Sequence, residues 1–255
     1  MPGSLCAILM YHAIQEQPSA ISIHPEKFRR QMEFFHDQKY NVIPLCDIGR
    51  TLTSQGVLPN KCVAITFDDG FRDFYTVAFP VLCDYNFPAT VFLVTGHIGR
   101  DNGWPGQPNS LPRFPIASWS EVAEMSRHGI DFGAHTVSHT RLDMIDSRTV
   151  EREIMDSKYA IEERIGRPVL TFAYPYGKFS TMTKSIVQDN FTVACGTRNG
   201  LVELDSDRFE LPRIEIQYLG KEFLLSGLPS WWMPYYLHSR DRLHKIRQVF
   251  QQEAY

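Results

Sequence analysis

Long apolar runs and a strong net charge are both missing from this 255-residue sequence. No stretch reaches the roughly 18–20 consecutive apolar residues that a membrane-spanning helix needs, and the start lacks a basic stretch followed by an apolar one. We therefore expect no integral membrane segment and a cytoplasmic location, or a place in the cell envelope or outside the cell if the sequence is a trimmed piece. The net charge of -3 makes nucleic acid an unexpected partner.

Cysteine pairs and nucleotide-binding motifs are missing as well. The five cysteines are an odd number without a CxxC pair, so we expect them to be reduced residues of the core. No GxGxxG or Walker pattern supports a nucleotide-binding protein. With 43% hydrophobic and 22% charged residues, the composition excludes disordered and fibrous classes.

The chain alternates between β-rich runs and stretches with helical spacing. The strand candidates are 6–11, 62–67, 89–94, 131–135, 170–174, 191–195 and 211–216, and the clearest helix candidates are 25–38, 118–128 and 147–165. This order predicts an α/β protein with a parallel sheet, built as a distorted (β/α)7-type barrel. We expect one barrel domain over residues 1–230, with an aromatic and helical tail, 231–255, packed on it.

Polar residues follow the predicted strands at the end where barrel enzymes place their sites. They are His12 in MYH, Asp68 and Asp69 in TFDDG, His135 and His139 in HTVSH, Tyr176 in YPYG, and Arg213 in the last predicted strand. These residues are scattered along the chain but converge on one predicted rim. Their convergence is a stronger signal than any one of them.

HTVSH and TFDDG together predict a metal site. Two imidazoles four residues apart share a face if the turn is helical, and they can also converge on one ion from a loop. With one aspartate they form a three-ligand set that leaves positions open for water and substrate. Taken singly, HxxxH also occurs by chance on helix surfaces, and Asp-Asp-Gly is commonly a turn or a cap. Judged from its position in the sequence alone, His12 is expected to be a histidine of the core that is hydrogen-bonded to the backbone.

These motifs resemble those of the polysaccharide deacetylases of the NodB-homology type, carbohydrate esterase family 4. TFDDG, HTVSH and YPYG stand in the family's order between residues 66 and 177. The MYH opening and residues 22–44 are similar to the subgroup that de-N-acetylates poly-N-acetylglucosamine. The resemblance leaves only the tail from about residue 231 unaccounted for.

The resemblance implies a role for each motif residue. Asp68 matches the catalytic base, and Asp69, His135 and His139 match the ligands of a divalent metal, expected to be Zn²⁺ with Co²⁺ or Ni²⁺ as alternatives. Tyr176 matches the residue whose backbone N–H helps to hold the oxyanion, and His12 matches the general acid of the exopolysaccharide subgroup. Trp104, in the irregular segment 101–115, is expected to contact the substrate together with Pro175 and Tyr176.

The sequence departs from the family pattern at two places. Ala173 stands where many members have an arginine that orients the base, and we hypothesise that Arg213 supplies that guanidinium from the last strand. The family's C-terminal Leu-x-His motif has only a weak candidate at Leu237-His238.

The expected function is metal-dependent hydrolysis of N-acetyl groups on an amino sugar of a poly- or oligosaccharide, with release of acetate. Two alternatives stay open at this point. One is a sugar-binding module that keeps the fold without turnover, for which the missing third-motif arginine is the best support. The other is a metal-dependent phosphoesterase, although the motifs offer neither extra carboxylates for a second ion nor clear phosphate-binding bases.

Overall fold

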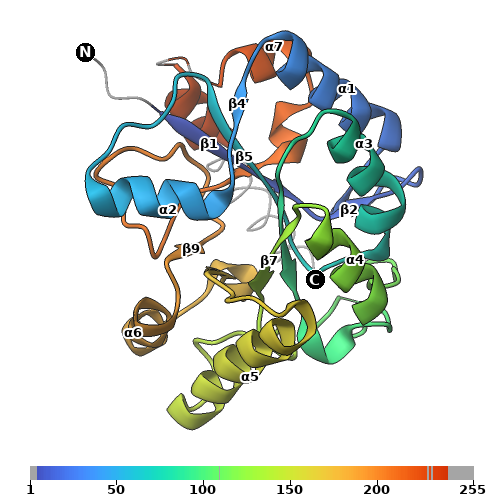
Figure 1. The fold of residues 1–255 in the computed structure, drawn as a ribbon, viewed down its shortest axis with the longest axis vertical. Helices are drawn as coiled ribbons and strands as arrows, with labels where there is room; N and C mark the ends of the chain where they lie inside the picture. Colours follow the sequence, from blue (N-terminus) through green and yellow to red (C-terminus); the bar gives the residue numbers. More distant parts are fainter. Residues whose placement is uncertain (1–4, 109, 229, 231, 241–255) are drawn as a thin grey trace, which may run out of the picture.

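A parallel, curled sheet forms the centre of the protein (Figure 1). The computed structural model describes residues 5–108, 110–228, 230 and 232–240. The strands of the main sheet are β1 (Cys6–Tyr11), β4 (Asn41–Val42), β5 (Cys62–Phe67), β6 (Thr90–Leu93), β7 (Asp131–Ala134), β8 (Thr171–Ala173), β9 (Val193–Cys195) and β10 (Ile214–Glu215). Their order is β10-β1-β5-β6-β7-β8-β9, and β4 pairs with the first half of β5.

The sheet curls until its two end strands approach each other. An isolated parallel bridge joins Cys195 to Leu211, three residues before β10 pairs with β1 through Leu9 and Ile214. Backbone bonds from Leu211 N to Ala194 O (2.9 Å) and from Gly196 N to Leu211 O (3.0 Å) complete this contact. The expected distorted barrel is therefore confirmed, with an irregular seam between β9 and β10.

Helices pack around the sheet (Figure 1). They are α1 (Pro25–Asp37), α2 (Leu45–Ser54), α3 (Phe79–Asp84), which continues a π-helix at Phe74–Ala78, α4 (Trp119–Arg127), α5 (Ser147–Ile165), α6 (Thr181–Asn190) and α7 (Glu222–Ser226). The Ser118 side chain and Glu121 form the capping box that starts α4, and Gly166 ends α5 in a left-handed conformation. A two-stranded pair, β2 (Ala13–Ile14) with β3 (Ser22–Ile23), precedes α1.

Alternation along the strands assigns their residues to two of the three hydrophobic clusters of the core. In β1, Cys6 and Ile8 belong to the smaller cluster, which fills the barrel interior, whereas Ala7, Leu9 and Tyr11 join the larger cluster under the helices. All five are buried, with at most 2% of their surface exposed. A strand covered on both faces reads as a continuous apolar run, which is why CAILMY and CVAITF were recognisable from sequence.

The sequence predicted the strands better than the helices. All seven predicted strands are present: β1 and β5 match the predicted ranges 6–11 and 62–67, and the other five are shorter than predicted. The three predicted helices are found with ends shifted by at most one residue. Sequence reasoning missed α2, α3, α6, α7 and the short strands β2, β3 and β4. The cysteine prediction was partly wrong: all five are free, but Cys46 is half-buried and Cys83 is exposed on the last turn of α3.

The start of the C-terminal tail packs on the barrel. Met233 and Leu237 are buried in the larger cluster, in a helical stretch over 233–240. Trp231 and residues 241–255 lie outside the described residues, so the predicted division at residue 231 stays a prediction.

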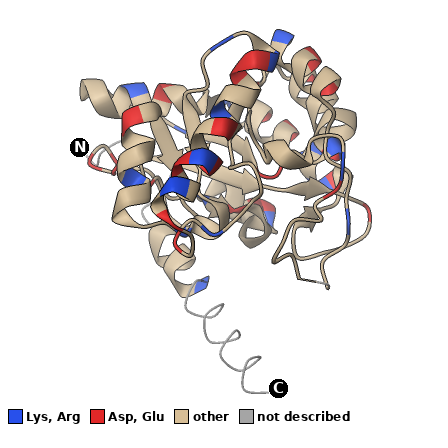
Figure 2. Cartoon of the chain, turned by 90° about the horizontal axis from the view of Figure 1, so that it is seen from below, with Lys and Arg blue, Asp and Glu red and all other residues tan. Residues whose placement is uncertain are grey.

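Figure 2 shows acidic and basic positions interspersed along the helices on the side in view. This mixed distribution agrees with the small net charge of the sequence. Within the described part of the chain, every helix is too short or too polar to cross a bilayer.

Candidate metal centre and active site

The inward sides of β5 and β7 each lead to a polar residue at the carboxyl-terminal edge of the barrel. Asp68 continues the inward series of β5, after Cys62, Ala64 and Thr66, and His135 continues that of β7. Parallel strands end at the same edge, so these side chains meet although 67 sequence positions separate them. Arg213, just before β10, occupies the same interior and is fully buried.

Asp69, His135 and His139 bring one ligand atom each to a common point. Oδ1 of Asp69 lies 3.3 Å from Nε2 of His139 and 3.7 Å from Nε2 of His135, and the three ligand atoms lie within 4.8 Å of one another. Two ligands that each lie about 2.0–2.1 Å from a tetrahedral ion are roughly 3.4 Å apart. The observed separations therefore fit one shared ion.

The protonation states of these residues also fit a cation. Burial lowers the pKa of His135 to about 4 and that of His139 well below its usual value, so both rings are neutral near pH 7 and free to act as ligands. Burial raises the pKa of Asp69 to about 7, because its Oδ1 is buried without a hydrogen-bond donor among the described residues. A bound cation would compensate that carboxylate.

Hydrogen bonds to the opposite ring nitrogens fix both histidines. His135 Nδ1 lies 2.7 Å from the carbonyl oxygen of Ala173, an atom that can only accept, so Nδ1 carries the proton and Nε2 keeps its lone pair for a metal. His139 Nδ1 lies 3.1 Å from the hydroxyl of Tyr176. Trp104 packs on the His139 ring, with centroids 4.5 Å apart.

The loop between the two histidines is held by helix α5. Glu153 accepts hydrogen bonds from the backbone N–H groups of Val137 and Ser138 (both 2.9 Å) and from the Ser138 hydroxyl (2.8 Å). The N–H of His139 donates to the Thr136 hydroxyl at 2.9 Å. HTVSH is thus a loop and not a helical turn, and Glu153 is a positioning residue that sequence reasoning missed.

Asp68 and Arg213 form a buried, bidentate ion pair. Two N–H groups of Arg213 donate to Oδ1 and Oδ2 of Asp68 at 2.6 and 2.7 Å, and Nε donates to the carbonyl of Gly196 at 2.9 Å. Burial alone would raise the pKa of Asp68, but the charge of Arg213 and these hydrogen bonds hold it well below its usual range. The contact hypothesised from the missing arginine at Ala173 is present in the structure.

Backbone strain is concentrated at this edge. Asp69, Thr136, His139 and Tyr176 all have a positive φ, between 56° and 73°, which is uncommon outside glycine. At Asp69 it turns a side chain of the outward series of β5 towards the ion site. Gly70 follows with φ 75°, and a Cβ there would approach Cδ2 of Leu93 to 2.6 Å. Such strain clusters at functional sites, where neighbouring contacts enforce it.

The remaining candidates lie around the three ligands. His12 follows β1, is half-buried, and lies near enough for its protonated ring to lower the pKa of Asp69. Tyr176 is 40% exposed, whereas Pro175 is buried and Trp104 is only 3% exposed. Of these three residues, which are expected to contact the substrate, Tyr176 is therefore the most exposed. His238 lies on the helical stretch of the tail, and no described contact places it at the ligands.

Comparison with known families agrees with this geometry. Residues 55–193, more than half of the chain, match the family model described as polysaccharide deacetylase. The chain belongs to the polysaccharide deacetylase family. The matched region contains the three proposed ligands and Asp68, and it excludes His12 and Arg213.

Relatives of this deacetylase carry names that agree with the family. A poly-β-1,6-N-acetyl-D-glucosamine N-deacetylase of Staphylococcus epidermidis is 29% identical over 209 residues, covering 76% of this chain and 67% of that protein. The solved Streptococcus pyogenes deacetylase PplD, in complex with acetate, has a TM-score of 0.73 at 27% identity, covering 84% of this chain and 93% of the other. IcaB from Ammonifex degensii has a TM-score of 0.74 at 22% identity, covering 91% and 98%, and shows the shared fold.

The protein is therefore an enzyme, a hydrolase that removes N-acetyl groups from a glycan. A divalent metal fits both the family and the cluster of Asp69, His135 and His139. The prediction of family, fold and activity made from TFDDG, HTVSH and YPYG is confirmed. The roles of individual residues and the identity of the ion stay predictions.

Proposed function

We propose that this enzyme de-N-acetylates a β-linked poly- or oligo-N-acetylglucosamine, and that Asp69, His135 and His139 hold its divalent ion. The approach of three ligand atoms beside an aspartate that is clamped by Arg213 is the observation that carries this proposal. The name of the Staphylococcus epidermidis relative supports the substrate class. The two alternatives are less well supported, since a binding module needs no clamped carboxylate and a phosphoesterase usually has a second metal site.

Zn²⁺ is the ion we propose, with Co²⁺ and Ni²⁺ as alternatives. Two neutral imidazoles and one carboxylate are a set of ligands that catalytic Zn²⁺ commonly uses, with further positions left for water or substrate. When bound, such an ion polarises the acetamide carbonyl and makes a water molecule more acidic.

Asp68 acts as the general base in this scheme. Its low pKa keeps it ionised, and Arg213 fixes the plane of its carboxylate through two hydrogen bonds. As the oxygen of water attacks the acetamide carbon, Asp68 accepts the proton that leaves the water. Arg213 is fully buried, so it acts through Asp68 and not on the substrate.

Tyr176 and His12 complete the reaction. The backbone N–H of Tyr176 donates to the oxyanion of the tetrahedral intermediate, a contact worth roughly 3 kcal/mol in other acyl-transfer sites. His12 gives a proton to the sugar nitrogen as the C–N bond breaks, which releases acetate and a free amine. Tyr176, Pro175 and Trp104 line the place where the acetylated sugar is expected, with Tyr176 as the exposed contact.

A pair of variants separates the base from the ligands. We expect Asp68→Asn to retain the metal and to release acetate from a β-1,6-linked N-acetylglucosamine oligomer about 10²–10⁴-fold more slowly. Asp69→Ala should lose both the metal and the activity, because two neutral imidazoles alone hold an ion weakly. Acetate release and metal content per folded protein are the measurements.

The same pair can contradict the proposal. Wild-type acetate release by Asp68→Asn would remove Asp68 as the base. Full metal content in Asp69→Ala would remove Asp69 as a ligand. Exposed Asp143, which pairs with Arg141 near this edge, provides a matched control, since Asp143→Asn should change neither quantity.

A further inference from the structure

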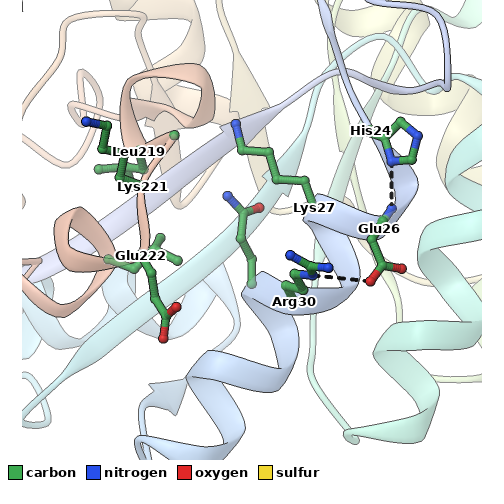
Figure 3. A pocket seen from close by; sticks show the side chains of 10 residues that line it. His24, Glu26, Lys27, Arg30, Leu219, Lys221 and Glu222 are labelled. Atoms are coloured by element: carbon green, nitrogen blue, oxygen red, sulfur yellow. Dashed lines mark hydrogen bonds and ion pairs between the residues drawn. The ribbon is translucent and has the colours of Figure 1, made fainter.

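A second pocket, with a volume of about 460 Å³, lies outside the barrel between α1 and the segment that follows β10. Figure 3 shows side chains of both segments around it, with Lys27 and Arg30 from α1 on one side and Lys221 and Glu222 on the other. Because β1 and β10 are neighbours in the sheet, α1 and the segment after β10 are neighbours on its outer face. The metal ligands face the barrel interior and do not line this pocket.

Gln31 gives the pocket a buried donor without a partner. The residue is 3% exposed and lines the pocket, and its Oε1 accepts the hydroxyl of Tyr11 at 3.0 Å. Its Nε2 has no acceptor among the described residues. A buried amide N–H left unpaired costs about 1–3 kcal/mol, and an acceptor atom of a ligand would remove this cost.

Two lysines lie on the same pocket without an anionic partner. Neither Lys27 nor Lys221 forms an ion pair with any described residue at salt-bridge distance. Lys27 is half-buried, and this burial lowers the pKa of its ammonium, with partial compensation from the charge of Glu215. An anionic ligand would offset the desolvation of a half-buried ammonium that lacks a contact ion.

The acidic side chains of the pocket do not cancel this charge. Glu26 is neutralised by Arg30 at 3.2 Å, so it leaves both lysines available. Glu222 is exposed at the start of α7 and can accept hydrogen bonds from hydroxyl groups. The lining therefore offers cationic and amide donors to an anion, beside one carboxylate suited to sugar hydroxyls.

We propose that this pocket is a second ligand site, which binds an oxyanion carried by a saccharide, either a carboxylate or a phosphate. Lys27, Lys221 and the Nε2 group of Gln31 contact the oxyanion, and Glu222 accepts the neighbouring hydroxyl groups. Charge-assisted hydrogen bonds of this kind are about twice as strong as neutral ones, so the anion dominates recognition.

The pocket lies beside the proposed active site but is separate from it. Lys27 is near enough to Glu215, at the end of β10, for their charges to interact, and Glu215 is similarly near His12. Tyr11, which holds Gln31, directly precedes His12 in the chain. The pocket is thus connected to the rim of the barrel through Tyr11 and Glu215.

Calorimetric titration of the metal-loaded protein tests the proposal. The probes are D-glucuronate for the carboxylate, D-glucose 1-phosphate for the phosphate and D-glucose as the neutral control, in a buffer without phosphate or carboxylates. We expect at least one acidic probe to bind about tenfold or more tightly than glucose, and the tighter of the two identifies the oxyanion.

Variants locate that binding. Lys27→Gln removes one charge, and Gln31→Glu replaces the donor by an acceptor while still accepting the Tyr11 hydroxyl; each should weaken the acidic probe about tenfold or more. Lys221 lies on the surface, so Lys221→Gln should fold. This variant therefore still tests the proposal if Gln31→Glu fails to fold. Arg29→Gln, on the exposed side of α1 outside the pocket, is the matched control and should bind like the parent.

Two results would overturn the proposal. One is that neither acidic probe binds more tightly than glucose. The other is that Lys27→Gln, Lys221→Gln and folded Gln31→Glu bind the probes as the parent does, which would place the anion elsewhere, for example at the metal. No variant changes a proposed metal ligand or Asp68, so either failure leaves the proposed deacetylation untouched.

Discussion

The two ends of the barrel interior are built from the same strands and yet have opposite character. At the amino-terminal end, Cys6, Ile8, Cys62 and Ala64 pack as a buried apolar cluster with no charged member. At the carboxyl-terminal end, the next inward position of β5 is Thr66 and the one after it is Asp68. The difference shows that one strand can contribute to stability at one end and to chemistry at the other.

The backbone conformation also differs between the two ends of the barrel. Asp69 and His139 have left-handed backbone conformations themselves, and His135 directly precedes another left-handed residue, Thr136. In contrast, β1 and β5 pair in unbroken register from Cys6 and Cys62 to Tyr11 and Phe67. Regular pairing at the amino-terminal end makes the strands rigid. The contacts of Glu153, Ala173 and Arg213 then hold the strained segments at the other end.

The largest expected effect is a loss of stability caused by a substitution at the apolar, amino-terminal end of the barrel. Ile8→Ala creates a cavity in a fully buried position and should lower the free energy of unfolding by about 2–5 kcal/mol. Urea unfolding measures this loss. Acetate release per folded molecule should stay within about twofold of the parent, since Ile8 belongs to the apolar cluster. A large loss of turnover in the folded variant would mean that the two ends are coupled.

A smaller effect is expected from the loop that carries His139. Glu153→Gln keeps the size of the side chain but removes the carboxylate that accepts the N–H groups of Val137 and Ser138. Positioning contacts of this kind typically change metal affinity 10–100-fold. We expect weaker metal binding with activity restored by excess metal, measured by competition with a chelator. Glu163→Gln, on the exposed face of α5, is the matched control. Unchanged affinity in Glu153→Gln would show that the loop keeps its shape without Glu153.

The smallest effect concerns Asp73, which is buried at the start of the π-helix and accepts a hydrogen bond from Gln15 at 2.7 Å. Burial raises its pKa to about 7 from an ordinary value of 3.8. A raised folded-state pKa means that stability is greatest at low pH and is lost as the pH rises through about 7. Between pH 6 and pH 8 this loss is about 1 kcal/mol.

Asp73→Asn should therefore remove that pH dependence. Urea unfolding at pH 6 and pH 8, in parent and variant, measures the difference between the two slopes. Equal slopes would show that Asp73 is ionised in the folded protein throughout this range. Asp84→Asn, on the exposed last turn of α3, should leave the slope of the parent unchanged.

Much of the site was visible in the sequence because each motif reports its local chemistry. TFDDG and HTVSH join a buried strand to metal-ligand residue types, and the alternation of β5 directs Asp68 inward. Glu153 was missed because it is one of many acidic residues on a charged helix, with no local sign that its partners are backbone N–H groups. The pocket of Gln31 was missed because its two walls, α1 and the segment after β10, are about 190 residues apart in the chain.

The sequence alone determined the parallel α/β architecture, the family and the set of metal-ligand residue types, because apolar periodicity and short motifs are local properties of the chain. The tertiary structure decided which atoms meet. Only the curled sheet brings Arg213 to Asp68 and closes the distances between Asp69, His135 and His139. Side-chain contacts between distant segments depend on register and backbone turns, as at Asp69 with φ 73°, and the sequence pattern does not encode these locally.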